Sequence, residues 1–250
     1  MTTAYPPDPM RPHLVPLGAD ADSAAPVFLD WETTPHLTIA AGTGYGTTSL
    51  IRLIVAHTVA TGGTATVIDG WTCEYEEFVG VPGLDVAYEP PEIEDVIRSY
   101  VGDIEDRLRA AAKDPHLVTD GRVLAVDGLP ALWHNAKEEE DHGLLWALTD
   151  LKRILLNGRA AGVHLVTDID AATVVQQLDA DLLRSATATL MIGPADHDLA
   201  RLLGVDPLLE RPRAGAAIWR TPAAVQGRQL DLPHITAEQA RSLALGVIHS

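Results

Sequence analysis

The stretch that decides the fold is Ala41-Gly42-Thr43-Gly44-Tyr45-Gly46-Thr47-Thr48. It follows an apolar strand expected at residues 35–40, and it opens an amphipathic helix expected at residues 49–61. Strand, glycine-rich loop and helix in this order are the context of a phosphate-binding loop, whose pattern is G-x-x-x-x-G-K-[S/T]. In this chain Ala41 stands at the first glycine, Thr47 at the lysine and Thr48 at the hydroxyl that binds Mg²⁺.

The loop supplies the candidate cofactor-binding residues. Backbone N–H groups in such a turn bind phosphate whatever the side chains are, and Thr48 keeps a hydroxyl for Mg²⁺. Thr47 has neither the charge nor the reach of the lysine that draws on the β- and γ-phosphate oxygens. Loss of one such electrostatic group lowers a rate by about 10²–10³. The alternative is a strand–helix turn that needs its glycines for tightness. The residues expected to line an ATP site are Gly42, Thr43, Gly44, Tyr45, Gly46, Thr47, Thr48 and Ser49.

Composition places limits on class and partners. The chain has 250 residues, 46% hydrophobic and 21% charged, with a formal net charge of −17. Such an acidic chain repels the phosphates of nucleic acids unless its basic residues gather on one face. The basic cluster within residues 98–113 has helical spacing, which favours a solvated helix face. No apolar run approaches the ~20 residues of a membrane span, and the single cysteine, Cys73, excludes an intrachain disulfide. We expect a cytoplasmic protein.

Predicted strands alternate with predicted helices along the chain. This alternation predicts an α/β fold with a mostly parallel sheet covered on both faces, and ligands then bind at the carboxyl ends of the strands. Residues 1–25, rich in Pro, Ala and Asp, are expected to form an extended lead-in, and residues 26–250 one domain. Strands are expected at residues 27–29, 37–40, 64–68, 122–127, 163–167 and 188–192, a hairpin at 216–219 and 224–226, and further helices at 91–112, 143–157, 171–180, 196–203 and 237–245.

A second motif is Val123-Leu124-Ala125-Val126-Asp127-Gly128. An apolar strand that ends in Asp-Glu is the usual partner of a phosphate loop, because the Asp holds Mg²⁺ and the Glu polarises the attacking water. Asp127 is present and forms, with Thr48, the candidate metal-binding pair. Gly128 stands at the Glu position and cannot act as a general base. The alternative is that Asp127 caps the following helix.

Three further stretches complete a set of motifs in order and spacing. They are Pro35-His36-Leu37, Ile104-Glu105-Asp106-Arg107 and Gly158-Arg159-Ala160-Ala161-Gly162-Val163-His164-Leu165. With the loop and the Asp127 strand, they resemble the FtsK/SpoIIIE-type DNA translocase motor domains, including plasmid-transfer and type VII secretion relatives. The resemblance covers residues 26–230. It implies a RecA-like P-loop NTPase fold, ATP and Mg²⁺ as cofactors, and homo- or hetero-oligomers of FtsK-like subunits.

This sequence departs from the family pattern at four catalytic positions. Thr47 and Gly128 replace the lysine and the glutamate. Asp69 is followed by Gly70-Trp71 where the family has Pro-Lys. Asp170 stands where the family has the glutamine that senses the γ-phosphate, and an acid there repels a polyphosphate unless a cation intervenes. A retained scaffold with altered catalytic positions predicts a pseudo-ATPase that acts as a binding or assembly subunit for a protein partner. Such a subunit binds nucleotide without turnover or does not bind it.

Two alternatives stay open. The first is an active ATP-dependent DNA translocase in plasmid transfer or chromosome handling. It needs Arg52 or a neighbouring subunit's arginine in place of the lysine, and Asp170 or Asp127 as the base. The net charge of −17 disfavours it, because a ring that grips DNA presents positive charge to its pore. The second is a scaffold that uses the old nucleotide cleft for a different small ligand.

Three other residues have two interpretations each. Arg184 lies where such motors place arginines that act on a neighbouring subunit, but a helix-end cation is the simpler interpretation. Trp133 lines a partner pocket or packs against the sheet edge. His164 is expected to be a core histidine with its hydrogen bonds satisfied rather than a ligand.

Overall fold

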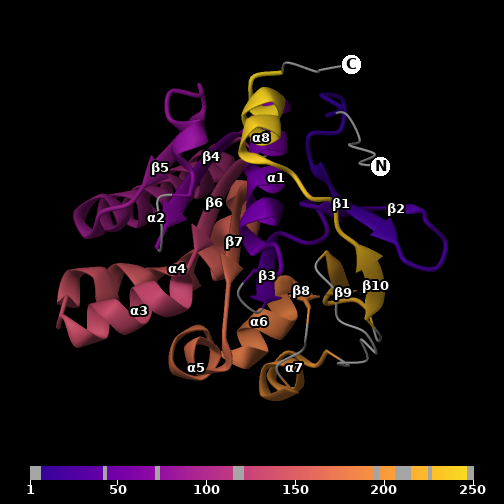
Figure 1. Cartoon of the computed structure of the whole chain (residues 1–250). Coiled ribbons are helices and arrows are strands. Elements are labelled where there is room, and N and C mark those ends of the chain that lie inside the picture. Colours follow the sequence, from indigo (N-terminus) through magenta and orange to yellow (C-terminus); the bar gives the residue numbers. More distant parts are fainter. Residues whose placement is uncertain are drawn as a thin grey trace.

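The structure, a computed structural model, describes residues 7–41, 44–70, 74–114, 121–193, 197–205, 215–224 and 227–246. Ten strands of this described part form one sheet in the order β2-β1-β10-β9-β8-β3-β7-β6-β4-β5 (Figure 1). The strands are β1 Leu14–Asp20, β2 Pro26–Asp30, β3 His36–Ala41, β4 Thr64–Asp69, β5 Leu84–Ala87, β6 Arg122–Asp127, β7 Val163–Asp168, β8 Thr187–Ile192, β9 Ala216–Arg220 and β10 Arg228–Asp231.

The sheet has a parallel part and an antiparallel part. The strands from β8 through β3, β7, β6 and β4 to β5 pair in parallel. The strands β9, β10, β1 and β2 extend the β8 edge by antiparallel pairing. Parallel neighbours need crossover connections, and here these contain the helices. The predicted α/β architecture with a mostly parallel sheet is confirmed.

Helices cover both faces of the sheet (Figure 1). One face carries α1 (Thr47–Ala60), α8 (Ala237–Ala244) and the short 3₁₀ helix η1 (Glu76–Phe78), whose apolar residues share one core cluster. The other cluster contains residues of the remaining helices. These are α2 Pro90–Lys113, α3 Leu129–Glu138, α4 His142–Ala161, α5 Ala171–Thr173, the π-helical turn η2 Val174–Leu178, α6 Ala180–Ala186 and α7 His197–Leu203.

The alternation of side chains along β6 shows how one strand serves both layers. Leu124 and Val126 belong to the cluster of α2 and α4, whereas Val123 and Ala125 belong to the cluster of α1. All four side chains are fully buried. Burial of one Val or Leu side chain contributes about 1.5–3 kcal/mol, so the continuous apolar run of β6 stabilises both layers at once.

The structure corrects part of the predicted organisation. The expected lead-in at residues 1–25 contains β1, whose Val15 and Leu17 are fully buried and whose residues pair with β2 and β10. The Pro and Asp residues of this segment obscure the strand signal in its sequence. The helix α3 is not among the helices predicted from the periodicity, and only the alternative in which Asp127 caps a following helix implied it. The second strand of the closing hairpin begins at Arg228, and Val225 and Gln226 lie outside the described residues.

The helix expected at residues 171–180 is interrupted. It consists of α5, the π-helical turn η2 and the start of α6. The break comes at Asp179, which has a φ of 61° and caps α6 through its carboxylate. A helix cannot continue through a positive φ, so the local conformation of Asp179 overrides the helical periodicity of the surrounding residues.

No helix of the described residues is long and apolar enough to cross a membrane.

Gly158 tests how closely α4 packs on the sheet. A β-carbon at Gly158 would lie 2.4 Å from the carbonyl oxygen of Val163 and 3.0 Å from Cε1 of His36. We expect Gly158→Ala to lower the free energy of unfolding by about 1–3 kcal/mol, because the backbone of β7 cannot move aside. Urea unfolding measures this change.

The control is Gly102→Ala on the exposed side of α2, where a β-carbon meets nothing within 4 Å. There alanine should raise the free energy of unfolding by about 0.5–1 kcal/mol, since glycine is a poor helix former. Equal effects of the two substitutions would show that α4 does not lie tightly on β7.

Candidate active site

The glycine-rich loop joins β3 to α1 at the carboxyl end of β3. Gly44 and Gly46 have φ values of 82° and 114°, and a β-carbon at either position would meet nothing within 4 Å. Gly46 precedes the first residue of α1, and the first turn of this described helix contains no acidic residue and no side-chain cap. No side chain caps the N–H groups at the start of α1, so these groups can bind an anion.

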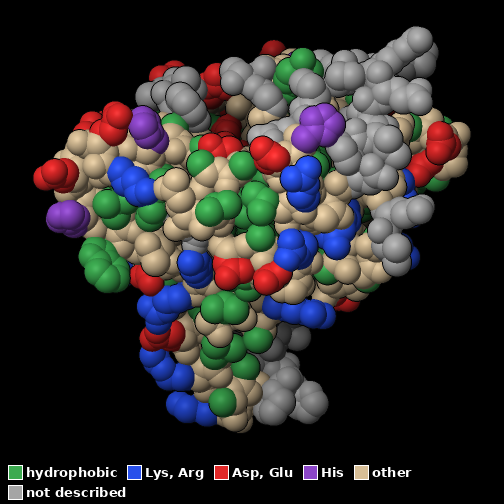
Figure 2. Space-filling model, turned by 90° about the horizontal axis from the view of Figure 1, so that it is seen from below, with side chains coloured by type: hydrophobic (Ala, Val, Ile, Leu, Met, Phe, Trp, Pro, Cys, Tyr) green, Lys and Arg blue, Asp and Glu red, His purple; other side chains and the backbone are tan. Residues whose placement is uncertain are grey.

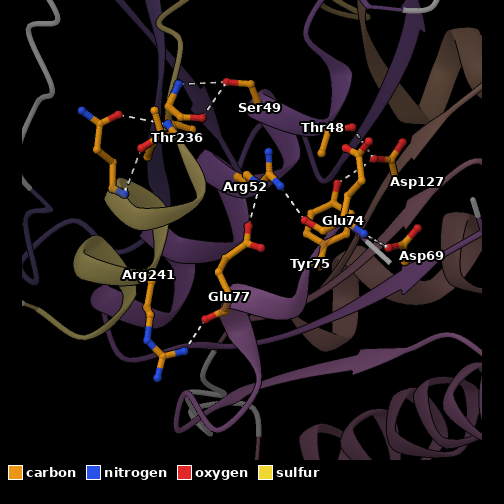
Figure 3. A network of polar contacts seen from close by, with 12 residues as sticks. Thr48, Ser49, Arg52, Asp69, Glu74, Tyr75, Glu77, Asp127, Thr236 and Arg241 are labelled. Carbon is orange, nitrogen blue, oxygen red and sulfur yellow. Dashed lines mark hydrogen bonds and ion pairs between the residues drawn. The ribbon is translucent and has the colours of Figure 1, made fainter. Parts of the chain in front are cut away.

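Thr48 and Asp127, the candidate metal-binding pair, lie in direct contact. The Thr48 hydroxyl donates to Oδ2 of Asp127 over 2.9 Å. A second donor reaches the same oxygen: the hydroxyl of Tyr75 lies 2.7 Å from Oδ2 of Asp127 (Figure 3). The pairing of a residue on α1 with one at the end of β6 follows from the parallel sheet, which brings the carboxyl ends of its strands to one edge.

Asp127 belongs to a group of acidic residues. Asp69 is its register partner on β4, and Oδ2 of Asp69 accepts a hydrogen bond from the backbone N–H of Glu74 over 2.7 Å. Burial raises the pKa of Asp127, the hydrogen bonds from Tyr75 and Thr48 lower it, and the charges of Asp69 and Glu74 raise it further, with a net rise. The pKa of the Tyr75 hydroxyl is raised by burial and by Asp127, so this group stays a donor.

Asp168 forms a second, half-buried carboxylate site. Its Oδ1 accepts the backbone N–H groups of Gly128 and Leu129 over 2.9 and 2.8 Å. Asp168, at the end of β7, thus satisfies the N-terminus of α3, so the alternative in which Asp127 caps this helix is wrong. Burial is the largest cause that raises the pKa of Asp168 to about 7, with a further contribution from the charge of Asp127.

The structure places the proposed replacement groups elsewhere. Arg52 donates from Nε to Oε1 of Glu77 over 2.5 Å and from Nη2 to the carbonyl oxygen of Glu74 (Figure 3). These contacts tie Arg52 to the segment after β4, so it does not take the place of the missing lysine. Asp170 caps α5 by accepting the N–H of Thr173 over 2.7 Å, which gives it a structural role. Arg184 bonds the carbonyl oxygen of Leu202 and the carboxylate of Asp181, as expected of a helix-end cation.

The remaining predicted site residues are distributed around the loop. Gly42 and Thr43 lie outside the described residues. Tyr45 lies on Gly193 at the end of β8, where a β-carbon would come within 2.3 Å of its ring. Thr47 is the first residue of α1 and is half-buried. Ser49 is buried and its hydroxyl exchanges hydrogen bonds with the backbone of Ile235 ahead of α8, so that hydroxyl serves the fold.

The residues present fit a phosphate better than they fit Mg²⁺. The glycine-rich turn and the uncapped N-terminus of α1 supply backbone donors that a phosphate can use. Mg²⁺ needs oxygen ligands in near-octahedral geometry at about 2.0–2.1 Å. The oxygen that would supply one of them, Oδ2 of Asp127, already accepts hydrogen bonds from Thr48 and Tyr75. The fit to the divalent cation is therefore poor.

Sequence reasoning missed Tyr75 and Glu74. Tyr75 and Phe78 are three residues apart, a helical spacing that hints at a packed turn, and both are fully buried with ring centroids 6.2 Å apart. The contact of Tyr75 with Asp127 joins segments 52 residues apart, so no local pattern reveals it.

Two other predicted residues belong to the core. His164 is buried, its Nδ1 lies 2.9 Å from the carbonyl oxygen of Pro35, and its ring stacks on Trp31. This confirms the interpretation of His164 as a core histidine. Trp133 is partly buried against the cluster of α2 and α4, which favours packing over a partner pocket.

Solved structures share this fold. The pCW3 conjugation coupling protein TcpA, in its monomer form with ATPγS, aligns over 95% of this chain and 72% of its own, with a TM-score of 0.72 and 17% identity. The chain has the fold of the FtsK/SpoIIIE-type P-loop motors. EccC (ATPases 2 and 3) of Thermomonospora curvata, in complex with a signal sequence peptide, aligns over 90% of this chain and 41% of its own, with a TM-score of 0.68 and 18% identity.

One curated relative is similar in sequence. The ESX secretion system protein EccC of Thermomonospora curvata is 30% identical over 115 residues, which cover 42% of this chain. The chain spans only 8% of the length of that relative. No protein-family model matches the sequence. The solved structures described above confirm the fold predicted from the FtsK/SpoIIIE resemblance.

The pKa of Asp168 predicts a pH-dependent stability. The folded chain keeps the Asp168 proton up to about pH 7, whereas the ordinary pKa of an aspartate in an unfolded chain is 3.8. Between these values the folded state binds more protons than the unfolded state, so the free energy of unfolding falls as the pH rises. Asp168→Asn keeps the acceptor for Gly128 and Leu129 but cannot titrate. We expect wild type to lose on the order of 2 kcal/mol more than Asp168→Asn between pH 5 and pH 7.

Urea unfolding of both proteins across this range makes the measurement. The buried histidines His36, His57 and His164 have pKa values lowered by burial, so their stabilising effect is lost as the pH falls. They are present in both proteins and cancel in the comparison. Parallel pH profiles for wild type and Asp168→Asn would contradict the raised pKa.

Proposed function

We propose that this chain is a catalytically degenerate P-loop domain of the FtsK/SpoIIIE kind, a pseudo-ATPase that acts as a binding or assembly subunit. The observation that carries the proposal is the combination of a retained phosphate loop with Thr47 and Gly128 at the positions of the lysine and the glutamate. Gly44, Gly46 and the uncapped start of α1 offer backbone donors to a phosphate, whereas Thr47 and Gly128 supply neither the cation nor the base of hydrolysis.

The charges around the loop support the loss of turnover. Asp69, Glu74, Asp127 and Asp168 gather at the carboxyl ends of β4, β6 and β7, and Arg52 is neutralised by Glu77. A triphosphate that enters this site meets Thr47 where an active motor presents a lysine, and acidic side chains lie at the neighbouring strand ends. Loss of one stabilising group of this kind costs about 3–4 kcal/mol in the transition state. We therefore expect weak nucleotide binding and negligible hydrolysis.

The surface charges support a protein partner rather than DNA. On α2, Arg98 pairs with Glu94 and Asp95, and Arg109 pairs with Glu105 and Asp106. The basic cluster predicted from the sequence is thus a helix face neutralised by its own acids. On the face shown in Figure 2, basic and acidic side chains are interspersed among apolar ones. A DNA-binding surface requires cations free to meet phosphates.

The partner that we propose is an active motor subunit of the same fold, in the cytoplasm. TcpA is a conjugation coupling protein, and EccC is a secretion-system protein whose structure contains a signal sequence peptide. The EccC structure contains ATPases 2 and 3, and we extend from it only the presence of more than one P-loop domain in an assembly. The outer side of α4 offers apolar contacts for a protein, since Trp146 is 75% exposed and Leu156 is 65% exposed.

The experiment is a titration of the purified chain with ATP and Mg²⁺, with hydrolysis followed in the same sample in the presence and absence of double-stranded DNA. The proposal expects a turnover indistinguishable from that of Thr48→Ala, with or without DNA. An ATPase activity that rises on addition of DNA and disappears in Thr48→Ala would establish the alternative, an active DNA translocase.

A gain-of-function variant tests the role of position 47. Thr47→Lys restores the cation at a half-buried position in the first turn of α1, and we expect ATP to bind at least about 10-fold more tightly. Isothermal titration measures the change. Thr47→Gln, of similar length without charge, is the control and should leave the affinity near that of wild type.

Restoring the glutamate should be less successful. Gly128 has a φ of 89° at the start of α3, where a residue with a β-carbon is strained. We therefore expect Thr47→Lys to raise nucleotide affinity without Gly128→Glu, and the double variant to be less stable than the single one. An unchanged affinity in Thr47→Lys would show that the loop no longer accepts a phosphate.

A further inference from the structure

Tyr75 is the buried group at the site that the FtsK/SpoIIIE resemblance does not account for. Its side chain is fully buried, and its hydroxyl donates to Oδ2 of Asp127 over 2.7 Å. The same oxygen accepts the hydroxyl of Thr48 over 2.9 Å. The carboxylate oxygen nearest the loop therefore has its hydrogen-bonding capacity occupied by two groups of the chain itself.

The position of Tyr75 is fixed by its surroundings. The ring of Phe78 lies nearly parallel to that of Tyr75, with centroids 6.2 Å apart and planes 20° apart. The guanidinium carbon of Arg52 lies 5.6 Å from the centre of the Tyr75 ring, and Glu77 holds that guanidinium in place. Rotation of Tyr75 away from Asp127 would disturb all of these contacts, so the hydroxyl stays at the carboxylate.

The Tyr75 hydroxyl also takes over part of the charge compensation of a cation. A buried carboxylate is stable when it is paired or hydrogen-bonded. Thr48 and Tyr75 supply two hydroxyl donors to Oδ2 of Asp127. Oδ2 of Asp127 is thus satisfied by donors from within the chain.

We infer that Tyr75 determines the ligand class of the loop by closing the divalent-cation position between Thr48 and Asp127. The loop then takes a phosphate group that arrives without Mg²⁺, such as that of a metal-free nucleoside diphosphate. This inference rests on the proposed function, because it concerns the ligand of the same loop. The inference concerns metal binding, whereas the proposed function concerns hydrolysis.

The first test measures metal binding directly. Mn²⁺, used as a spectroscopic substitute for Mg²⁺, is titrated into the full chain, and the free ion is followed by electron paramagnetic resonance. We expect Tyr75→Phe to bind Mn²⁺ at least 10-fold more tightly than wild type, because it keeps the ring and removes the hydroxyl from Asp127. A Mn²⁺ affinity equal in wild type and Tyr75→Phe would overturn the inference.

The matched control is Tyr100→Phe. Tyr100 is also buried, and its hydroxyl bonds Oγ1 of Thr66 and the carbonyl oxygen of Val123, away from the loop. Its loss should reproduce any general effect of removing a buried hydroxyl and leave Mn²⁺ affinity unchanged. A gain of Mn²⁺ affinity in Tyr100→Phe would also overturn the inference, since the effect would then not depend on Asp127.

The second test uses ADP by isothermal titration, with Mg²⁺ or with EDTA. Wild type should bind ADP within 2-fold in the two buffers, and Tyr75→Phe should bind it at least 10-fold more tightly with Mg²⁺. An equally large Mg²⁺ effect in wild type would show an open cation position. If wild type binds no ADP, the phosphate-binding part of the proposed function fails, and the Mn²⁺ comparison alone decides the role of Tyr75.

Discussion

The central parallel strands must be covered on both faces, and the rest of the structure depends on this constraint. Because β6, β7 and β3 are buried on either side, their side chains divide between the core under α1 and the core under α2 and α4. The crossover helices run back over the sheet, and every strand-to-helix turn therefore falls at the same edge. This edge therefore brings together the loop before α1, Asp127 and Asp168. Their meeting follows from the helices that cover the sheet and does not depend on the chemistry of the site.

The layered fold could be predicted from the sequence, because its signals are local. The apolar run of β6 and the glycines before α1 can each be recognised within a few residues of sequence. β1 was missed because it contains Pro16 and Gly18 and its place in the sheet is defined by its partners β2 and β10. At the site, the contact of Thr48 with Asp127 followed from motif knowledge. Tyr75 did not, because its partner is determined by the position of η1 against the sheet.

Two carboxyl groups of the site are satisfied by hydrogen bonds from within the chain. Asp127 is held by two hydroxyl groups and Asp168 by two backbone N–H groups. Both arrangements satisfy a half-buried carboxyl without an ion pair. Each carboxyl group now joins separate elements: Asp127 links β6 to α1 and η1, and Asp168 links β7 to α3. Both residues therefore help to hold this edge of the sheet together.

The pairing of β1 with β10 has a consequence for how the chain folds. Ala19 pairs with Asp231, so strands from the two ends of the described sequence are neighbours, and β10 lies between β9 and β1. The contacts of β1 with β10 close a loop that contains nearly the whole chain, and such long-range contacts slow folding. During synthesis the hairpin of β1 and β2 emerges before β10, and until β10 arrives its unpaired edge is prone to association. The parallel core can form before this closure, so the antiparallel extension is the part of the sheet expected to order last.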